Sequence, residues 1–133
     1  LIKHYLESAH KDIYETKQLR LVISNYNDEA LGMIDIFDFD FLNKRAGIGV
    51  LIKSEFNRAK GIGSEALQLL ISYCFTHLNL HQLFCNISED NEASIKLFTK
   101  QGFHNIGLKK DWIFNNKSFH NEFLLQLINT DVL

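Results

Sequence analysis

Apolar residues recur along this chain with two different periods, and these periods predict alternating strands and helices. Short apolar runs, β-branched or alternating with polar residues, predict strands at 19–23, 30–39, 45–53, 83–87, 104–114 and 118–128. Apolar residues three or four positions apart predict helices at 1–16, at about 61–78, and from Asn91 to just before Gly102. The predicted element order is therefore α-β-β-β-α-β-α-β-β.

The ends and turns of these elements follow from residues with strong backbone preferences. Asn91 is a typical N-cap, and Gly102 fits the C′ position at which helices end. Because the chain has no proline, its turns fall on Asn-, Asp- and Ser-rich clusters such as 25–28 and 115–118. The first three strands fit an antiparallel meander, and the helix between the third and fourth strands favours a parallel pair. The sequence thus predicts an α+β fold with a mixed sheet.

Composition narrows the classes of function. With 133 residues and 46% hydrophobic content, the chain fits one domain over residues 1–133. Its net charge of −2 gives no basic excess that would favour nucleic acid, and no apolar run reaches the roughly 20 residues of a membrane span. Cys74 and Cys85 fit core positions of a protein in a reducing, cytoplasmic compartment. No metal is expected, because the histidines lack ligand spacing.

The segment 58–63 carries the clearest chemical signal. It reads Arg-Ala-Lys-Gly-Ile-Gly and lies between a buried strand and a helix. Its two glycines let the backbone approach a ligand closely, and the start of a helix offers free N–H groups and a partial positive charge. Such a turn suits a phosphate or pyrophosphate. A nucleotide-binding domain of the P-loop type is disfavoured, because the turn lacks the G-x-x-x-x-G-K-(S/T) pattern.

A second motif extends this signal to a family resemblance. Arg58-x-x-Gly61-x-Gly63 matches the (Q/R)-x-x-G-x-(G/A) signature of GNAT-superfamily N-acetyltransferases. The run at 91–103, Asn-Glu-Ala-Ser-Ile-Lys-Leu-Phe-Thr-Lys-Gln-Gly-Phe, matches their second signature. The segment 78–83 resembles the branch that holds spermidine/diamine and ribosomal-protein acetyltransferases. The resemblance covers about residues 5–128.

The resemblance implies a fold, a cosubstrate and a set of contacts. The fold would be a mostly antiparallel sheet with a central splayed parallel pair, flanked by helices, and the family's first strand and helix are missing from this chain. Acetyl-CoA would be the cosubstrate, bound between the glycine turn, the end of the third strand and the turn at Asn91. The residues implied in its binding are Leu51, Ile52, Lys53, Arg58, Ala59, Lys60, Gly61, Ile62, Gly63, Ser64, Asn91, Ser94 and Phe98.

Because the chain departs from the family pattern at two positions, its sequence does not identify the general acid and the general base. Many relatives place a Tyr that protonates the CoA sulfur where this chain has Phe98, and a Glu general base where this chain has the acid-free stretch 46–49. An attacking amine must lose a proton and the leaving thiolate is best protonated, so water or other groups would have to substitute. The candidate substitutes are Asp35, Asp38, Asp40 and Ser88.

Several of these residues also fit simpler interpretations. The aspartates at 35, 38 and 40 alternate with apolar residues, as in a half-solvated strand, or they form an acidic wall for a cationic substrate. His81 fits a junction between helix and strand rather than a catalytic group. The stretch 109–112 fits a solvated strand with one anchoring aromatic, or a substrate-facing segment.

The leading functional hypothesis is an acetyl-CoA-dependent N-acetyltransferase, in which a polyamine or other small primary amine attacks the thioester directly in a ternary complex. The alternative acceptor is a peptide N-terminus, as in ribosomal-protein acetyltransferases. The alternative outside the enzyme class is a non-catalytic acyl-CoA-binding module, because of Phe98 and the missing Glu. An unpaired outer edge on the strand at 19–23 makes either a homodimer or a preceding segment a further expectation.

Overall fold

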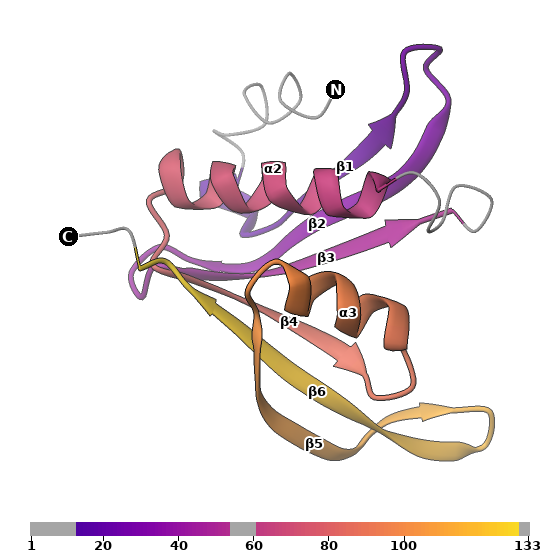
Figure 1. Cartoon of the computed structure of the whole chain (residues 1–133). Helices are drawn as coiled ribbons and strands as arrows, with labels where there is room; N and C mark the ends of the chain where they lie inside the picture. The colour runs from indigo at the N-terminus through magenta and orange to yellow at the C-terminus, as the bar shows by residue number, and fades with distance from the viewer. Residues whose placement is uncertain (1–12, 54–60, 131–133) are drawn as a thin grey trace.

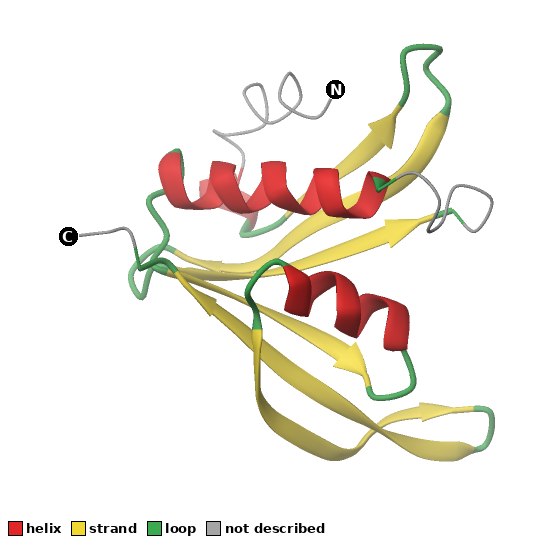
Figure 2. Cartoon of the chain, viewed as in Figure 1, coloured by secondary structure: helices red, strands yellow, loops and turns green. Residues whose placement is uncertain are grey.

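The computed structural model describes residues 13–53 and 61–130, which form a curved sheet with helices on one face (Figures 1 and 2). The strands are β1 Leu19–Ser24, β2 Ala30–Asp40, β3 Arg45–Ile52, β4 Gln82–Ser88, β5 His104–Asn115 and β6 Ser118–Ile128. The helices are α2 Ile62–Thr76 and α3 Glu92–Lys100, and residues 13–16 are also helical. The predicted elements are therefore confirmed to within a few residues, except that most of the helix predicted at 1–16 lies outside the described residues.

The sheet is mixed, as the sequence predicted. Its strand order is β1-β2-β3-β4-β6-β5, and every neighbouring pair is antiparallel except β3 and β4. The register places one set of buried side chains on a single face, where they meet α2 and α3. The core along this face includes Leu21, Ile34, Ile48, Leu67, Leu70, Leu83 and Leu125. We call the other face of the sheet, away from α2 and α3, the open face.

The parallel pair of β3 and β4 separates after a short contact. Pairing runs only over Arg45–Gln82, Ala46–Leu83 and Gly47–Phe84, although both strands continue. Figure 1 shows the two strands diverging toward the ends at which α2 and α3 begin. The backbone edges in this gap find no ladder partner across it in the described chain. The splay predicted from the family resemblance is thus present.

The ends of α3 follow from the residues predicted to cap it. The Asn91 side chain accepts a hydrogen bond from the Ser94 N–H at 3.1 Å, which satisfies one of the free donors of the first turn. At the other end Gly102 has φ of 102°, and the Phe103 N–H donates to the carbonyl of Phe98 at 3.1 Å. A residue with a side chain rarely adopts that φ, so glycine closes the helix here.

The final hairpin is more irregular than its alternating sequence predicted. Its turn carries Asn116 and Lys117 at φ of 51° and 64°, which suits a tight hairpin between twisted strands. The register of β5 shifts twice, once between Asn105 and Gly107 and again between Lys109 and Ile113. Trp112, expected to anchor this strand, is 63% exposed, and its ring lies under the Lys109 ammonium, 5.1 Å from the ring centroid.

Both cysteines are buried and unpaired, as predicted. Burial raises the pKa of the Cys85 thiol to about 12 and that of Cys74 further. Within the described ranges there is no group of three potential metal ligands. The same part of the chain contains no helix that is long and apolar enough to cross a membrane.

Candidate functional site

The first turn of α2 begins without a side-chain cap. Gly61 occupies the N-cap position with φ of 62°, in the left-handed region that favours glycine, and among the described residues no side-chain capping bond closes the first turn. The first backbone bond of the helix runs from the Glu65 N–H to the Gly61 carbonyl at 3.0 Å. The N–H groups before it have no carbonyl partner within the helix, so they can receive an anion. Of the predicted glycine turn, residues 58–60 lie outside the described chain.

The C-terminal half of α3 packs against this same turn of α2. The Gln101 side-chain amide donates to the Ser64 hydroxyl at 3.0 Å. A methyl group placed on Gly63 would lie 3.4 Å from the Leu97 side chain and 3.5 Å from that of Ile52. The predicted contacts Ile52, Gly63 and Ser64 are therefore brought together between the end of β3 and the two helices. Ser64 uses its hydroxyl to accept this bond, and its backbone N–H lies in the uncapped turn.

The end of β3 forms one wall of the splay. Leu51 is 62% exposed on the open face, whereas Ile52 is half-buried on the helix face. The Lys53 N–H donates to the Leu31 carbonyl of β2 at 2.9 Å, so the far end of β3 remains fixed to the sheet. Beside Gly49, no atom of the described residues other than its chain neighbours lies within 4 Å of the position that a Cβ would occupy. As far as the structure is described, the splay therefore opens onto free space on the open face of the sheet.

The turn between β4 and α3 forms the opposite wall. The Asn91 N–H donates to the Ser88 carbonyl at 2.9 Å, while the Asn91 side chain caps α3. The capping bond uses the side-chain oxygen, so the side-chain NH₂ group remains available as a donor. Asn91 can therefore cap the helix and contact a ligand in the splay at the same time, as the sequence suggested. Ser94 serves this turn through its backbone N–H.

Phe98 is a core residue in this structure. Its ring is 3% exposed and meets the Phe103 ring edge-on, with centroids 5.1 Å apart. It has no proton to donate. The nearest thiol to the splay along β4 is Cys85, whose pKa of about 12 reflects burial and keeps it in the neutral, weakly nucleophilic form. These residues therefore offer neither a general acid nor a covalent nucleophile.

The candidate aspartates differ sharply in their surroundings. Asp35 lies opposite Gly49 on the open face and forms an ion pair with Arg20, with 2.7 Å between Oδ1 and Nε. Asp40 closes the β2–β3 turn: it accepts from the Asn43 backbone N–H at 2.9 Å and side-chain amide at 2.8 Å, and these bonds lower its pKa. Asp38 sits at a bulge with φ of 48° and is exposed. Asp35 and Asp40 thus have partners of their own, and the acidic wall for a cationic substrate stays a prediction.

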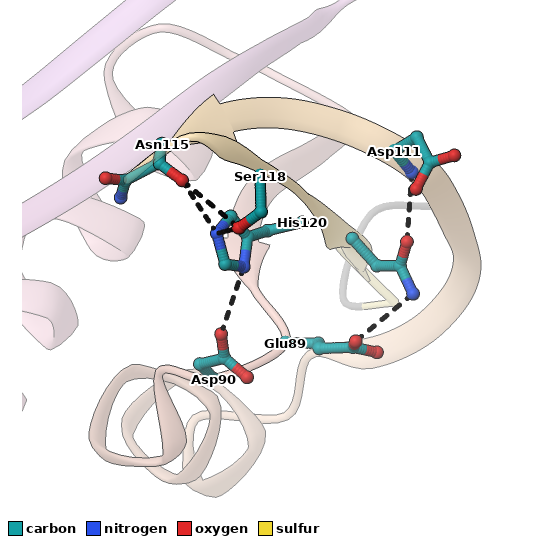
Figure 3. A network of polar contacts seen from close by, with 7 residues as sticks. Glu89, Asp90, Asp111, Asn115, Ser118 and His120 are labelled. Atoms are coloured by element: carbon teal, nitrogen blue, oxygen red, sulfur yellow. Dashed lines mark hydrogen bonds and ion pairs between the residues drawn. The ribbon is translucent and has the colours of Figure 1, made fainter.

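Two polar clusters near the β4–α3 turn were missed by sequence reasoning, because they join residues that lie 13 to 32 positions apart in the sequence. The first joins Lys109 of β5 to Glu122 of β6 and Asn86 of β4, with its ammonium 2.8 Å from an oxygen of each. The second surrounds His120 of β6 (Figure 3) and, through the hydrogen bond from Asn121 to Glu89, reaches the turn itself. The only sequence feature that could have pointed to these two clusters is the set of polar residues in the strand predicted at 118–128.

Part of the second cluster has the composition of a hydrolytic triad. The Nε2 atom of His120 lies 3.0 Å from the Ser118 hydroxyl, and Nδ1 lies 3.7 Å from an Asp90 oxygen. However, Nε2 also lies 3.1 Å from the carbonyl oxygen of Asn115. That contact requires a hydrogen on Nε2, so the same nitrogen cannot take a proton from Ser118. A nucleophilic serine is therefore disfavoured.

Comparisons with known proteins assign the family. The model of the Acetyltransferase (GNAT) domain matches residues 2–104 of this chain, which therefore belongs to that family. The chain is 28% identical over 111 residues to the spermidine N(1)-acetyltransferase of Escherichia coli K12, a match over 84% of this chain and 59% of that protein. It is 30% identical over 106 residues to YdaF of Bacillus subtilis, provisionally assigned as a ribosomal N-acetyltransferase, a match over 80% and 57%.

The fold is likewise that of a solved relative. The spermidine N-acetyltransferase of Vibrio cholerae, in a structure with CoA and spermine, matches with a TM-score of 0.81 at 20% identity, over 96% of this chain and 75% of that one. The family and the GNAT fold anticipated from the motifs are thus confirmed. The chain spans less than three fifths of the E. coli and B. subtilis relatives, at 59% and 57% of their lengths.

Proposed function

We propose that this protein transfers the acetyl group of acetyl-CoA to a primary amine. The observation that carries the proposal is the uncapped first turn of α2 beside the β3–β4 splay, with the capped first turn of α3 across the gap. Membership of the acetyltransferase family supports it. In this proposal the N–H groups from Gly61 to Ser64 hold the pyrophosphate of CoA, and the helix dipole favours its negative charge.

The pantetheine arm would then enter the splay as an extended segment. The unpaired backbone edge of β3 from Ile48 to Ile52 offers main-chain hydrogen bonds on one side, and the Asn91 side-chain NH₂ offers one on the other. The thioester would lie near the point where pairing ends, between Ile48 and Cys85. Because Cys85 stays a neutral thiol, we propose direct attack by the amine without an acyl-enzyme.

The acceptor would approach from the open face of the sheet. Free space lies beside Gly49 in the described chain, and the rings of Phe37 and Phe84 stand edge-to-face at Gly47, two residues earlier in β3, with centroids 5.7 Å apart. A cavity of about 210 Å³ lies on β1 and β2 next to this pair, lined by Arg20, Asp35 and Phe37 among others. Aromatic faces attract ammonium groups, so this surface suits an amine.

A polyamine or other small amine is our favoured acceptor. The spermidine acetyltransferases among the relatives and the exposed carboxylate of Asp38 support this choice. A peptide N-terminus is the alternative, supported by the similarity to YdaF. Asp35 and Asp40 are engaged with Arg20, Asn43 and Arg45, so water or the exposed carboxylate of Asp38 would accept the proton of the amine.

The experiment that tests this proposal is a CoA-release assay with acetyl-CoA and a panel of amines. Polyamines, amino sugars and short peptides would be compared at pH 8–9, where more of each amine is unprotonated. We expect release of CoA with spermidine-like amines. Acetyl-CoA binding without release across the panel would instead favour the non-catalytic acyl-CoA-binding module suggested by Phe98.

Location and assembly are proposed on separate grounds. The two buried, unpaired cysteines support a reducing, cytoplasmic compartment. A homodimer is supported by β1, which pairs on one side only in the described chain. The spermidine N-acetyltransferase of V. cholerae has been solved as a dodecamer, so self-association has a precedent on this fold.

A further inference from the structure

The turn between β4 and α3 is held in place by the strand β6. This turn, residues 88–91, leads into the helix cap at Asn91. Two consecutive residues of β6, His120 and Asn121, contact it through side chains (Figure 3). Neither residue belongs to the motifs that define the family resemblance, and both lie beyond residues 2–104, which the family model matches.

Asn121 connects three segments of the chain. Its side-chain NH₂ donates to the Glu89 carboxylate at 3.1 Å, and its backbone carbonyl accepts from the Glu89 N–H at 3.1 Å. Its side-chain oxygen accepts from the Asp111 N–H at 2.9 Å. Asp111 has φ of 54° at the second register shift of β5, where its N–H has left the strand ladder. The Asn121 side-chain amide thus provides a hydrogen-bond partner for the Asp111 N–H of β5 and contacts the β4–α3 turn as well.

His120 adds a second contact to the same turn. Its ring lies between the Asn115 carbonyl, 3.1 Å from Nε2, and the Asp90 carboxylate, 3.7 Å from Nδ1. The hairpin at 115–118 is therefore brought next to Asp90, the residue immediately before Asn91, in an ion pair that forms when the imidazole is protonated. Of the adjacent turn residues Glu89 and Asp90, Glu89 is the one held by hydrogen bonds from β6.

We infer that Asn121 is a positioning residue for acetyl-CoA binding, acting through the turn that carries Asn91. This inference rests on the proposed function, because it takes Asn91 to contact the pantetheine arm. Asn91 can meet a ligand in the splay only if residues 88–91 keep their path, and the hydrogen bonds between Asn121 and Glu89 fix that path before the ligand arrives. Such preorganisation lowers the ordering cost of binding.

The test exchanges the amide and the carboxylate of this contact. Asn121→Asp keeps an oxygen for the Asp111 N–H but places a carboxylate against Glu89, which breaks the side-chain hydrogen bond to the turn and leaves the backbone bond in place. Adding Glu89→Gln restores a donor, now on the turn, and an acceptor on β6. Asn105→Asp is the matched control, because Asn105 serves the other register shift of β5 by accepting from the Gly107 N–H at 3.1 Å.

Two measurements on the full chain are compared: the Kd for acetyl-CoA by calorimetry, and hydrogen exchange at the Asn91 and Ser94 amides without ligand. We expect Asn121→Asp to raise Kd by about three- to tenfold, the range that one hydrogen bond contributes, and to speed exchange. The double variant should return both to within about twofold of the parent, and Asn105→Asp should leave both unchanged.

The outcomes separate this inference from the proposed function. If the parent chain binds no acetyl-CoA, the proposed function fails, and with it the assignment of Asn121 to cofactor binding. If the parent binds but Asn121→Asp leaves Kd unchanged, only the positioning role is overturned. An equal effect of Asn105→Asp, or no recovery in the double variant, would also overturn it, because the change would then reflect general loosening of the hairpin.

Discussion

Two glycines of β3 provide a sharp test of the packing beside the splay. Gly47 and Gly49 lie on the same face of the same strand, two residues apart. A Cβ on Gly47 would come closer than 3.0 Å to three carbons of the Phe37 ring, whereas a Cβ on Gly49 would meet no described residue beyond its chain neighbours within 4 Å. The substitutions Gly47→Ala and Gly49→Ala therefore differ in which atoms the added methyl group contacts.

The expected difference in stability follows from the Phe37 ring. Carbon atoms pack at roughly 3.5–4.0 Å, so the ring must retreat on the order of 1 Å in Gly47→Ala. The retreat weakens its edge-to-face contact with Phe84, a type of contact that contributes about 0.5–1.5 kcal/mol, and overpacking commonly costs about 1–3 kcal/mol in total. Replacing a strand glycine by alanine without strain stabilises by about 0.4–1 kcal/mol through the unfolded state.

We therefore expect Gly47→Ala to lower the free energy of unfolding by about 1–2 kcal/mol and Gly49→Ala to raise it slightly, measured by urea denaturation with a shared m-value. Gly49→Ala should also raise KM for the amine, because its methyl group fills the space through which the acceptor is proposed to approach. Equal stabilities of the two variants would refute the packing described for Phe37. An unchanged KM in Gly49→Ala would refute the approach route.

Three further predictions concern the cap, the acidic residues and the thiols. Asn91→Asp keeps the oxygen that caps α3, so the free energy of unfolding should change by less than about 0.5 kcal/mol. The loss of the NH₂ donor should raise the Kd for acetyl-CoA in calorimetry. An unchanged Kd would show that Asn91 does not belong to the cofactor site. Asp38→Asn should raise KM for a polyamine, since Asn tolerates the positive φ at this bulge and the substitution removes only the charge. Asp40→Asn should instead lower the melting temperature and leave KM unchanged, because Asp40 closes the β2–β3 turn. The reverse pattern would contradict these roles of Asp38 and Asp40. Burial raises the pKa of Cys85 from 9.0 to about 12, so its contribution to the free energy of unfolding is complete below pH 9 and should be lost as pH rises from 9 to 12. Cys85→Ala should therefore make the free energy of unfolding fall less steeply with pH over this range, in denaturation curves taken at several pH values. An identical slope in the variant and the parent would contradict the raised pKa.

Most of the fold could be predicted from the sequence, because its signals are local. The alternating or β-branched runs at 19–23 and 83–87 match β1 and β4 closely, and both ends of α3 were marked by residues whose backbone preference decides the geometry. The parallel pair followed from the helix that connects β3 to β4. Prediction and structure agree for these elements because the hydrophobic period, the helix caps and the connection between strands all indicate the same arrangement.

The site could be predicted only where a motif covers it. Gly61, Gly63 and Asn91 stand where the family resemblance placed them, at the two helix starts that face the splay. The pairing of Asp35 with Arg20 and the contacts of Asn121 were not predictable, because they depend on cross-strand register and on a bulge at Asp111. A one-residue shift of register reverses the face of every side chain, so alternation alone could not bring these groups together.

Thermal unfolding with acetyl-CoA, compared with pantetheine at the same concentration, tests the central claim most directly. The two ligands share the arm that would occupy the splay, but only acetyl-CoA carries the pyrophosphate assigned to the first turn of α2. Acetyl-CoA at 100 times its Kd should add about 2.7 kcal/mol of stability and raise the melting temperature by roughly 5–10 °C, with a much smaller rise for pantetheine. No shift with millimolar acetyl-CoA, or equal shifts with both ligands, would contradict a pyrophosphate site at Gly61–Ser64.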